Sequence, residues 1–590
     1  MVNLTINNKA VSVPEGTTIL EAAKKTGVEI PTLCFLKDLN EIGSCRVCCV
    51  EIEGKEALVS SCNTPAEEGM VVYTNSQKAR FARRMNLQFI LSEHDYKCAS
   101  CHRNGSCRLQ KICSDMNINN VPYEQHYEPK IWNKDNLLLR DADKCIKCMR
   151  CVQVCEKIQS IGVWDMINTG KRTTVGIAGH REFSETNCAL CGQCIKYCPT
   201  GALHMHNDVY KLMNAVHDPG KIVVAQVAPA VRAAWGETHG LPYAQATEKR
   251  LAASIRALGV DYVFDTNFSA DLTIMEEANE LLEHMKDPGS HKWPMFTSCC
   301  PAWVRFLKSQ YPDMVDHLST AKSPQQMFGA VTKSYFAREI LGVDPKDVFC
   351  VSIMPCTAKK GECEIPTINN GADRDVDAVL STREFIRVLR SELINPALIE
   401  EEEFDSPLGT GSGAGVIFGS TGGVMEAALR TAWYTVNRKN PDPDQFRAVR
   451  GDKSIKEAEV RIGDTTVKAA VVSGLANARK LIERIRKGEA FYHFVEVMAC
   501  PGGCAQGCGQ PVGLDRTAPN QHRNEILYTL DRNNPLRFSH ENPSIIALYK
   551  DYLGQPLSHK AHELLHTDHH SWKMPAEKYE AADAPFTSSK

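Results

Sequence analysis

The chain has 590 residues, of which 43% are hydrophobic and 24% charged, and this length predicts about three to five domains. A formal net charge of -3 gives no electrostatic reason to expect a nucleic acid or an anionic membrane as partner, and no apolar run reaches the roughly 18 residues of a membrane span. The 25 cysteines are too sparse for a secreted disulfide scaffold, so their abundance indicates metal ligation.

Residues 1–78 predict a small α/β unit that begins with a hairpin and continues with a helix opened by a capping box of Thr18 and Glu21. The first residues lack the basic and apolar blocks of a signal peptide, so we expect a cytoplasmic location. Four cysteines in this unit differ in spacing from plant-type ferredoxins but favour a [2Fe–2S] cluster. They are Cys34, Cys45, Cys48 and Cys62.

Residues 79–126 predict a second, mostly helical module, with an amphipathic pattern in FARRMNLQFILSEH. An imidazole and three thiolates follow in a compact pattern. Taken alone, the histidine would be read as a surface or capping residue, but its place before the cysteine triplet favours ligation of a [4Fe–4S] cluster. The set is His94, Cys98, Cys101 and Cys107.

Residues 127–209 contain an internal duplication, in which one cysteine quartet follows another. Both quartets have the spacing of two-cluster ferredoxins, where the fourth cysteine of each run ligates the other cluster. Zinc or disulfides would not require two interleaved quartets. We therefore expect two [4Fe–4S] clusters, one held by Cys145, Cys148, Cys151 and Cys198 and the other by Cys155, Cys188, Cys191 and Cys194.

Residues 210–570 predict a large α/β domain, because short apolar strands alternate with helical stretches. The expected strands include KIVVAQVAP, DYVFDTNF, VFCVSIMP and GVIFGS. The glycine-rich tract that contains GVIFGS only weakly resembles a dinucleotide fingerprint and is interpreted as close packing. Residues 571–590 predict a polar tail. The fold class is thus α/β (α+β multidomain), with ferredoxin-like modules before a large α/β domain.

Three cysteine-containing motifs lie in this large domain: TSCCPAW from Thr297, MPCTAKKGE from Met354 and EVMACPGGCAQG from Glu496. In this order they resemble the signatures of [FeFe]-hydrogenases, and the N-terminal array is similar to that of the larger clostridial-type members. The array is also similar to the iron–sulfur subunit of respiratory dehydrogenases, but the three motifs are not part of that protein. The resemblance implies the reaction 2H+ + 2e- in equilibrium with H2.

The resemblance also implies an H-cluster, a [4Fe–4S] cubane joined through one cysteine to a diiron subsite with CO, cyanide and a bridging dithiolate. By resemblance the cubane ligands are Cys300, Cys356, Cys500 and Cys504, and Cys504 is the bridge. Adjacent side chains rarely aim at the same metal, so one of Cys299 and Cys300 is left over. The family assigns proton transfer to Cys299.

The rest of the proton route, by resemblance, is Glu277, Ser319 and Glu280, with His284 where many relatives have a surface arginine. The two glutamates are spaced i and i+3 in a predicted helix, so both can face one side; the alternative is that they only solvate that helix. Lys359 resembles the cation that hydrogen-bonds a cyanide ligand. The expected pocket lining is Ser298, Pro324, Gln325, Met354, Met498 and Phe418.

The expected partners are H2 and protons, maturation proteins, and either ferredoxin or a flavoprotein subunit that oxidises NAD(P)H in a larger, electron-bifurcating complex. The chain itself shows no convincing site for NAD(P), flavin or ATP. Non-catalytic relatives that assemble Fe–S clusters or sense H2 are disfavoured because Cys299 and both glutamates are present. The zinc-protease pattern from His562 to His566 lacks a third ligand and is interpreted as structural.

Overall fold

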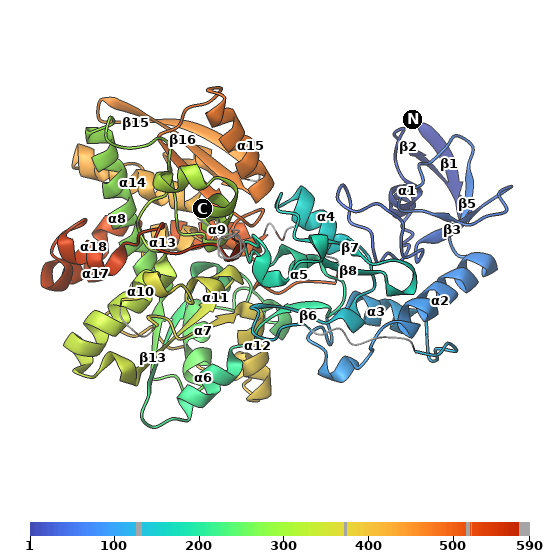
Figure 1. The fold of residues 1–590 in the computed structure, drawn as a ribbon, viewed down its shortest axis with the longest axis horizontal. Coiled ribbons are helices and arrows are strands. Elements are labelled where there is room, and N and C mark those ends of the chain that lie inside the picture. The colour runs from blue at the N-terminus through green and yellow to red at the C-terminus, as the bar shows by residue number, and fades with distance from the viewer. Residues whose placement is uncertain (126–131, 371–373, 452, 515–519, 521, 577–590) are drawn as a thin grey trace, which may run out of the picture.

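The computed structural model describes residues 1–125, 132–370, 374–451, 453–514, 520 and 522–576. They form a large body with a smaller extension that ends in two prongs (Figure 1). The expected boundary between residues 126 and 127 and the tail from residue 577 onwards lie outside the described residues. Within the described residues, no helix is both long and apolar enough to cross a membrane.

The N-terminal prong is a five-stranded sheet with one helix, α1 (Ile19–Lys25). The predicted hairpin forms, and the predicted capping box of Thr18 and Glu21 opens α1. The strands are β1 (Val2–Ile6), β2 (Lys9–Val13), β3 (Cys49–Ile52), β4 (Val59–Ser60) and β5 (Val71–Tyr73), in the order β2-β1-β5-β3-β4.

The second prong is helical, as predicted, and consists of α2 (Gln77–Ser92) and α3 (Arg108–Asp115). Between the prongs and the large body lies the duplicated module, with α4 (Arg150–Lys157) and α5 (Gln193–Tyr197) (Figure 1). Its short strands pair as β6 (Leu138–Arg140) with β9 (Leu203–Met205), and β7 (Trp164–Ile167) with β8 (Thr174–Ile177).

The duplication is visible in the backbone of this module. Met149 and Gly192 precede α4 and α5, and both have positive φ angles, of 64° and 71°. Two residues earlier in each repeat, Lys147 and Leu190 both have φ of 54°. Non-glycine residues seldom adopt this conformation, so its recurrence at matched positions is what a structural repeat would produce.

The large body contains two four-stranded sheets. The first is parallel throughout, in the order β11-β10-β13-β14, and the second, β12-β17-β16-β15, ends in an antiparallel hairpin. The strands are β10 (Ile222–Val227), β11 (Tyr262–Asp265), β12 (Met295–Phe296), β13 (Val348–Met354), β14 (Ala378–Ser381), β15 (Ile455–Ile462), β16 (Thr465–Ser473) and β17 (Phe494–Met498).

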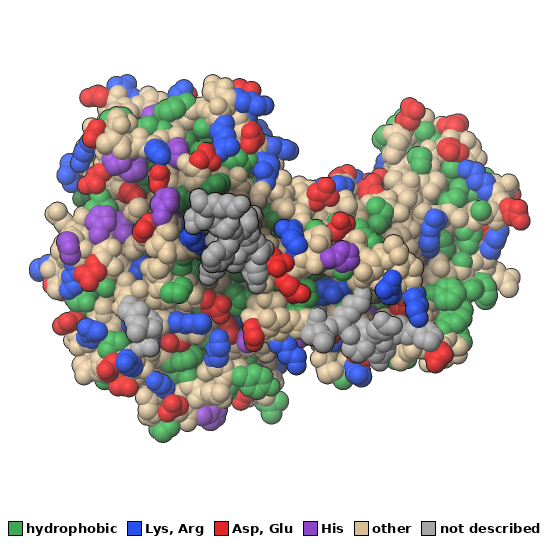
Figure 2. Space-filling view, in the orientation of Figure 1, with side chains coloured by type: hydrophobic (Ala, Val, Ile, Leu, Met, Phe, Trp, Pro, Cys, Tyr) green, Lys and Arg blue, Asp and Glu red, His purple; other side chains and the backbone are tan. Residues whose placement is uncertain are grey.

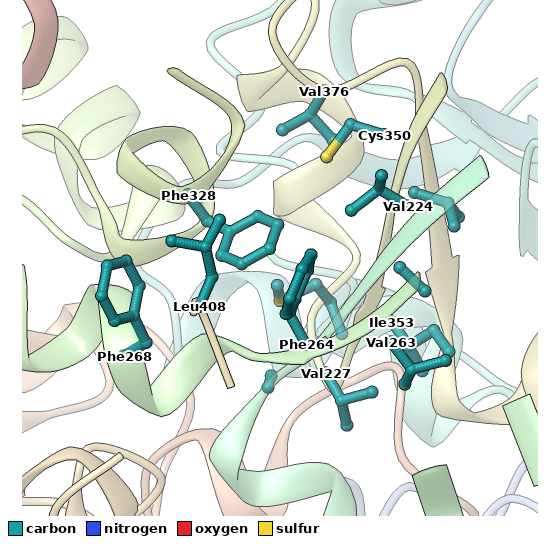
Figure 3. Packing of buried hydrophobic residues seen from close by; sticks show 14 of the residues in the cluster. Val224, Val227, Val263, Phe264, Phe268, Phe328, Cys350, Ile353, Val376 and Leu408 are labelled. Atoms are coloured by element: carbon teal, nitrogen blue, oxygen red, sulfur yellow. The ribbon is translucent and has the colours of Figure 1, made fainter. Parts of the chain in front are cut away.

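Helices cover both sheets, and aromatic side chains from β11, α8 and α10 pack over the first sheet (Figure 3). The helices of the large body are α6 (Val209–Val216), α7 (Glu248–Arg256), α8 (Thr266–Lys286), α9 (Pro301–Gln310), α10 (Pro324–Val331), α11 (Ala358–Glu362), α12 (Thr382–Ser391), α13 (Gly413–Ile417), α14 (Gly423–Asn437), α15 (Leu475–Arg486), α16 (His522–Asn533), α17 (Pro543–Leu548) and α18 (His559–Leu565).

One predicted strand is wrong: GVIFGS lies in and after the helix α13. Ser412 caps this helix by accepting a hydrogen bond from the Gly415 N–H. A Cβ on Gly415 would lie 2.7 Å from the backbone oxygen of Asn267 in α8. The apolar run therefore reflects a short helix buried on all sides, which periodicity alone does not distinguish from a buried strand.

Candidate active site

The three cysteine motifs each follow the carboxyl end of a parallel strand. Cys299 and Cys300 come after β12, Cys356 after β13, and Cys500 after β17. In open α/β sheets, sites form outside the carboxyl ends of parallel strands. Because β13 belongs to the first sheet and β12 and β17 to the second, the motifs meet between the two sheets.

Four thiols gather at this place. Burial and the charges of Cys500, Cys300 and Cys504 hold the pKa of Cys356 well above its usual value. Burial, followed by the charges of Cys300 and Cys500, likewise raises the pKa of Cys504. Thiolates that are so buried and so close together need a compensating metal charge.

Four thiolates are the ligand set of an iron–sulfur cubane, which takes each of its four cysteines on a different iron. The donor set of Cys300, Cys356, Cys500 and Cys504 therefore fits the cubane.

A fifth thiol, Cys299, lies beside this set and beside a carboxyl group. Its side chain is buried, and burial followed by the charge of Glu277 raises its pKa well above the usual value. Burial and the charge of Glu280 raise the pKa of Glu277 to about 8. The Ser319 hydroxyl donates a hydrogen bond of 2.5 Å to Glu280. The structure thus brings together the four residues of the expected proton route.

At the surface end of that route, His284 stacks on His291 with ring centroids 3.8 Å apart. Burial is the main cause that lowers the pKa of His284, and the charge of Glu280 opposes it. His284 and Glu280 lie four residues apart on α8, so they are neighbours on one helix face.

Lys359 has a carboxylate partner that the sequence analysis did not assign. Its Nζ donates to Glu362 at 2.9 Å and to the backbone oxygen of Cys299 at 3.1 Å. Although burial opposes it, the charge of Glu362 raises the pKa of Lys359. Gln325 also donates to Glu362, at 3.1 Å. The i and i+3 spacing of Lys359 and Glu362 on one helix was the available signal.

The remaining expected lining residues lie in different parts of the large body. Met498 and Phe418 pack in the same apolar cluster as Cys299, while Met354 packs in the core of the first sheet. Pro324 is the first residue of α10. Ser298 donates a hydrogen bond of 2.6 Å to the backbone oxygen of Ala321.

Glu496 is a second residue that the sequence analysis left without a role. It is fully buried, and it accepts hydrogen bonds of 2.7 Å from the backbone N–H groups of Gly422 and Met425. These donors lie at the start of α14, where the helix dipole favours a negative charge. Glu496 thereby ties the third cysteine motif to α14.

In the N-terminal sheet domain, the cysteines form two pairs. A hydrogen bond to Cys34 raises the pKa of Cys45, and a hydrogen bond to Cys48 raises that of Cys62. Two pairs of thiols match the two irons of a [2Fe–2S] cluster, in which four cysteines are shared between two metals.

The duplicated module brings its cysteines together in the interleaved way expected from their spacing. One small cavity is lined by Cys145, Cys148, Cys151 and Cys198. In the second set, burial and the charges of Cys188 and Cys155 hold the pKa of Cys194 well above its usual value. Burial and the charge of Cys194 do the same for Cys191.

In the helical prong, the His94 imidazole is buried, and burial lowers its pKa to about 4. Its Nδ1 has no hydrogen-bond partner among the described residues, and a neutral imidazole is the form that ligates metals. Burial and the charge of Cys101 raise the pKa of Cys98. The Cys107 thiol donates to the backbone oxygen of Pro199, at 3.7 Å, in the duplicated module.

Both prongs contact the same side of the duplicated module. Asn40 donates hydrogen bonds to the backbone oxygens of Cys34, at 2.8 Å, and of Cys148, at 2.9 Å. In the helical prong, the Cys107 thiol donates to the backbone oxygen of Pro199, the residue after Cys198 of the same set. The cysteine sets therefore form a branched arrangement, with two outer sets that meet at the set containing Cys148.

The other end of the duplicated module contacts the large body. Arg305 donates to the backbone oxygen of Cys188 at 3.1 Å, and Thr357, next to Cys356, donates to that of Leu190 at 3.2 Å. Cys188 and Cys356 also border one apolar cluster. The set that contains Cys188 is thus the one beside the four-thiol site.

Comparison with known proteins agrees with this arrangement. Residues 221–508 match the family model for the iron only hydrogenase large subunit, C-terminal domain, and residues 520–572 match the iron hydrogenase small subunit. The chain is 45% identical over 580 residues to the NADP-reducing hydrogenase subunit HndD of Solidesulfovibrio fructosivorans, covering 96% of this chain and 98% of that one. The chain belongs to the iron-only hydrogenases.

The N-terminal part of this hydrogenase matches three iron–sulfur models: a 2Fe-2S iron-sulfur cluster binding domain (1–77), the NADH-ubiquinone oxidoreductase-G iron-sulfur binding region (83–122) and a 4Fe-4S dicluster domain (144–202). Iron hydrogenase 1 of Clostridium pasteurianum is 39% identical, over 96% of this chain and 99% of its own. The solved apo [FeFe]-hydrogenase HydA1 of Chlamydomonas reinhardtii is 43% identical, with a TM-score of 0.56, over 63% of this chain and 100% of that chain.

The predicted family, fold class and enzyme activity are therefore confirmed. The protein is an iron-only hydrogenase, an oxidoreductase that interconverts H2 with protons and electrons and that carries [2Fe–2S] and [4Fe–4S] binding domains. When bound, the H-cluster supplies the redox chemistry at H2.

Proposed function

We propose that H2 turnover takes place at the four-thiol site, with the cubane held by Cys300, Cys356, Cys500 and Cys504 and with Cys504 as the bridge to the diiron subsite. The single observation that carries this proposal is the position of a fifth thiol. Cys299 is buried beside the set and beside Glu277, so a proton donor that is not a ligand lies where the reaction needs one.

Protons leave by way of Cys299, Glu277, Ser319 and Glu280 and reach the surface near His284. A group that relays protons works best when its pKa lies near the operating pH, and the pKa of Glu277, raised to about 8 by burial and by Glu280, meets that condition. The Ser319 hydroxyl can accept a proton while it donates its own to Glu280.

Lys359, held by Glu362, provides a positive charge at the wall of the site. In a buried, weakly screened pocket such a charge stabilises an anionic group more than it does in water. We assign it to the cyanide-bearing side of the H-cluster. Ser298, Pro324, Gln325, Met354, Met498 and Phe418 form the proposed lining, with donors for cyanide and apolar walls for CO.

Electrons travel through one [2Fe–2S] and three [4Fe–4S] clusters, each held by the cysteine sets described above and, in the helical prong, by His94. The carrier we propose is ferredoxin. The second candidate is a flavoprotein subunit that oxidises NAD(P)H, and the similarity to an NADP-reducing hydrogenase subunit favours it. In this proposal, the cluster-binding units span residues 1–78, 79–126 and 127–209. The catalytic domain spans residues 210–570, and a tail follows at 571–590. We propose a cytoplasmic location.

Infrared spectroscopy on protein matured anaerobically, with its dedicated maturation proteins, tests the site. We expect bands of metal-bound CO and cyanide, which are lost when Cys504 is replaced by alanine. Bands that persist in the Cys504→Ala variant would refute the bridging role. Protein produced without maturation is expected to be inactive.

The two candidate carriers separate in an assay of the purified chain. Turnover with reduced ferredoxin by the chain alone supports the first candidate. Turnover that requires a flavoprotein recovered with the chain from native extract, together with NAD(P)H, supports the second.

A further inference from the structure

Glu280, the last buried carboxyl of the proposed proton route, has two oxygens with different neighbours. Oε2 accepts the hydrogen bond from Ser319. Oε1 accepts a hydrogen bond from the backbone N–H of Thr320 at 2.9 Å, and the oxygen of the Thr320 hydroxyl lies 3.0 Å from it. The first oxygen belongs to the route through Ser319, and the second opens a connection that this route does not use.

The connection continues from Thr320 into the C-terminal segment. The Thr320 hydroxyl lies 2.8 Å from Nδ1 of His566, and Nε2 of His566 lies 3.0 Å from Glu276. Glu276 is fully buried and also accepts hydrogen bonds from the Tyr549 hydroxyl and from the backbone N–H of Leu557. A carboxylate at Nε2 favours the tautomer that carries its proton there, which leaves Nδ1 free to accept from Thr320.

Backbone contacts hold this arrangement in place. The segment around His566 forms an antiparallel bridge with Ala321. The Thr567 N–H donates to the Thr320 oxygen, and the Lys322 N–H donates to the Leu565 oxygen, both at 2.8 Å. The imidazole is therefore positioned by the strand-like pairing of two segments that are distant in sequence.

The connection ends at water. Thr320 and His566 both line a surface cavity of about 490 Å³, together with His562, whose ring centroid lies 4.3 Å from that of His566. Histidine side chains gather on the left of this face of the molecule, where α17 and α18 lie (Figures 1 and 2). The other titratable groups that line the cavity are Asp316, Asp568, His569 and His570.

We propose that a second proton branch leaves Glu280 through Thr320 and His566 and opens into this cavity, parallel to the branch at His284. In one outward step the Glu280 carboxyl gives its proton to the Thr320 oxygen, and the Thr320 hydroxyl proton passes to Nδ1 of His566. The imidazolium, balanced by Glu276, then gives its Nδ1 proton to water in the cavity, while Nε2 keeps its proton on Glu276. One proton enters and one leaves, and no electrons move.

This branch rests on the proposed route as far as Glu280. It also assigns His566, the last residue of the protease-like pattern, to proton transfer. His566 pairs with Glu276 and Thr320 as a proton-relay residue. It is an intermediate and not a catalytic residue, because it acts on the H-cluster only through Glu280.

The first test compares Thr320→Val, which keeps the shape but removes the hydroxyl, with Thr320→Ser, which keeps the hydroxyl. In protein made without the diiron subsite, infrared difference spectra are expected to show the Glu280 carboxyl band shifted by the valine and restored by the serine. In matured protein, the valine variant loses H2 turnover severalfold and the serine variant regains it. An unshifted band in the Thr320→Val variant would overturn the proposal.

The second test uses chemical rescue. His566→Ala lowers H2 turnover, and added imidazole restores it, which a purely structural histidine would not show. His570→Gln, on the exposed rim of the same cavity, is the control and keeps turnover. Retention of the CO and cyanide bands in each variant shows that the H-cluster is intact, and a rate in His566→Ala that imidazole does not raise counts against the branch.

The third test blocks both branches. Either His284→Phe or Thr320→Val leaves one exit, so each single variant loses turnover only severalfold, while the double variant falls by roughly 100-fold or more, the scale of a lost proton-transfer step. If the loss of turnover in the double variant only equals the product of the two single losses, the branches are not parallel. Glu280→Gln separates the two proposals. If this variant keeps full H2 turnover, the proposed proton route through Glu280 is wrong. If it loses turnover completely while Thr320→Val leaves turnover unchanged, only the second branch is wrong.

Discussion

The N-terminal cluster modules and the catalytic domain bring their cysteines together in opposite ways. The N-terminal sets come from neighbouring stretches of chain: in the duplicated module, three members of each set follow one another within one loop and helix, and the fourth comes from the other repeat. The four thiols of the catalytic domain come from the ends of strands in two sheets. The electron relay is therefore built locally, and the active site depends on the whole domain fold.

The two regions also differ in what surrounds the thiols. In the catalytic domain, carboxyl groups such as Glu277 and Glu496 are fully buried close to the cysteines. In the duplicated module, the buried neighbour of Cys148 is the guanidinium of Arg150. A relay needs only to carry electrons, whereas the catalytic domain must also move protons, and buried carboxyl groups with raised pKa values suit that task.

Cys299→Ala gives the sharpest test of this contrast, because it removes a thiol of the catalytic domain that is not a ligand. We expect H2 turnover to fall by about 10²–10⁴-fold, the usual contribution of a positioned proton donor, with iron content and the CO and cyanide bands unchanged. Cys363→Ala, a buried thiol in the core of the first sheet, is the control and keeps turnover. A variant at Cys299 with normal rates would remove the proposed proton route.

Glu277→Gln tests the buried carboxyl. In the unsubstituted protein, we expect the infrared band of the protonated Glu277 carboxyl below pH 8. The band disappears with a midpoint of about 8, because burial and Glu280 raise the pKa of Glu277. A carboxyl group whose pKa is raised in the folded state stabilises the fold at pH values below its pKa in the unfolded chain. That contribution is lost as the pH rises through about 8. Turnover of the glutamine variant falls by roughly 100-fold. A band midpoint near 4.5 would contradict the buried position.

The same contrast decides what could be predicted from the sequence. The quartets around Cys148 and Cys191 were assigned from spacing alone, because a local cluster motif leaves its geometry in the intervals between residues. Cys300, Cys356 and Cys504 are far apart in the sequence, so their spacing does not predict that they share one site. That prediction came from the family resemblance. The fold class followed from the alternation of strands and helices, but GVIFGS was misassigned because a short buried helix lacks a polar face.

The partners of known site residues were also beyond sequence reasoning. Glu362 and Lys359 share one helix, so their pairing had a local signal. Thr320, Glu276 and His566 come from a loop, the helix α8 and the C-terminal segment. Hydrogen bonds between such distant segments follow only from tertiary packing, which leaves no pattern in one sequence.

A third test probes the branched relay. Cys148→Ala disturbs the set at which both prongs meet, so electron exchange with the external carrier is expected to be mostly lost. Cys62→Ala disturbs only the sheet prong, and the helical prong keeps part of the exchange. Measuring carrier-linked turnover beside the CO and cyanide bands distinguishes relay damage from active-site damage. Equal losses in the two variants would show that the sheet prong is the sole entry and that the relay is not branched.

The smallest expected effect concerns the packing that holds the catalytic domain together. Gly415→Ala places a Cβ 2.7 Å from the backbone oxygen of Asn267, at the contact of α13 with α8, the helix that carries Glu277 and Glu280. Overpacking of this kind costs about 1–3 kcal/mol, seen as a lower midpoint of thermal unfolding. Gly289→Ala, whose Cβ would meet only the Asp287 side chain, at 4.0 Å, is the matched control and leaves that midpoint unchanged.

Because α8 also carries the proton route, the same substitution is expected to reduce turnover more than it reduces cluster content. A shift of α8 by a few tenths of an ångström lengthens the hydrogen bonds of Glu280 to Ser319 and Thr320 without touching a ligand. A comparable substitution in a cluster module is expected to affect the clusters of that module and to leave the H-cluster bands unchanged. Loss of the CO and cyanide bands in Gly415→Ala, in step with turnover, would instead show that α13 supports the cluster directly.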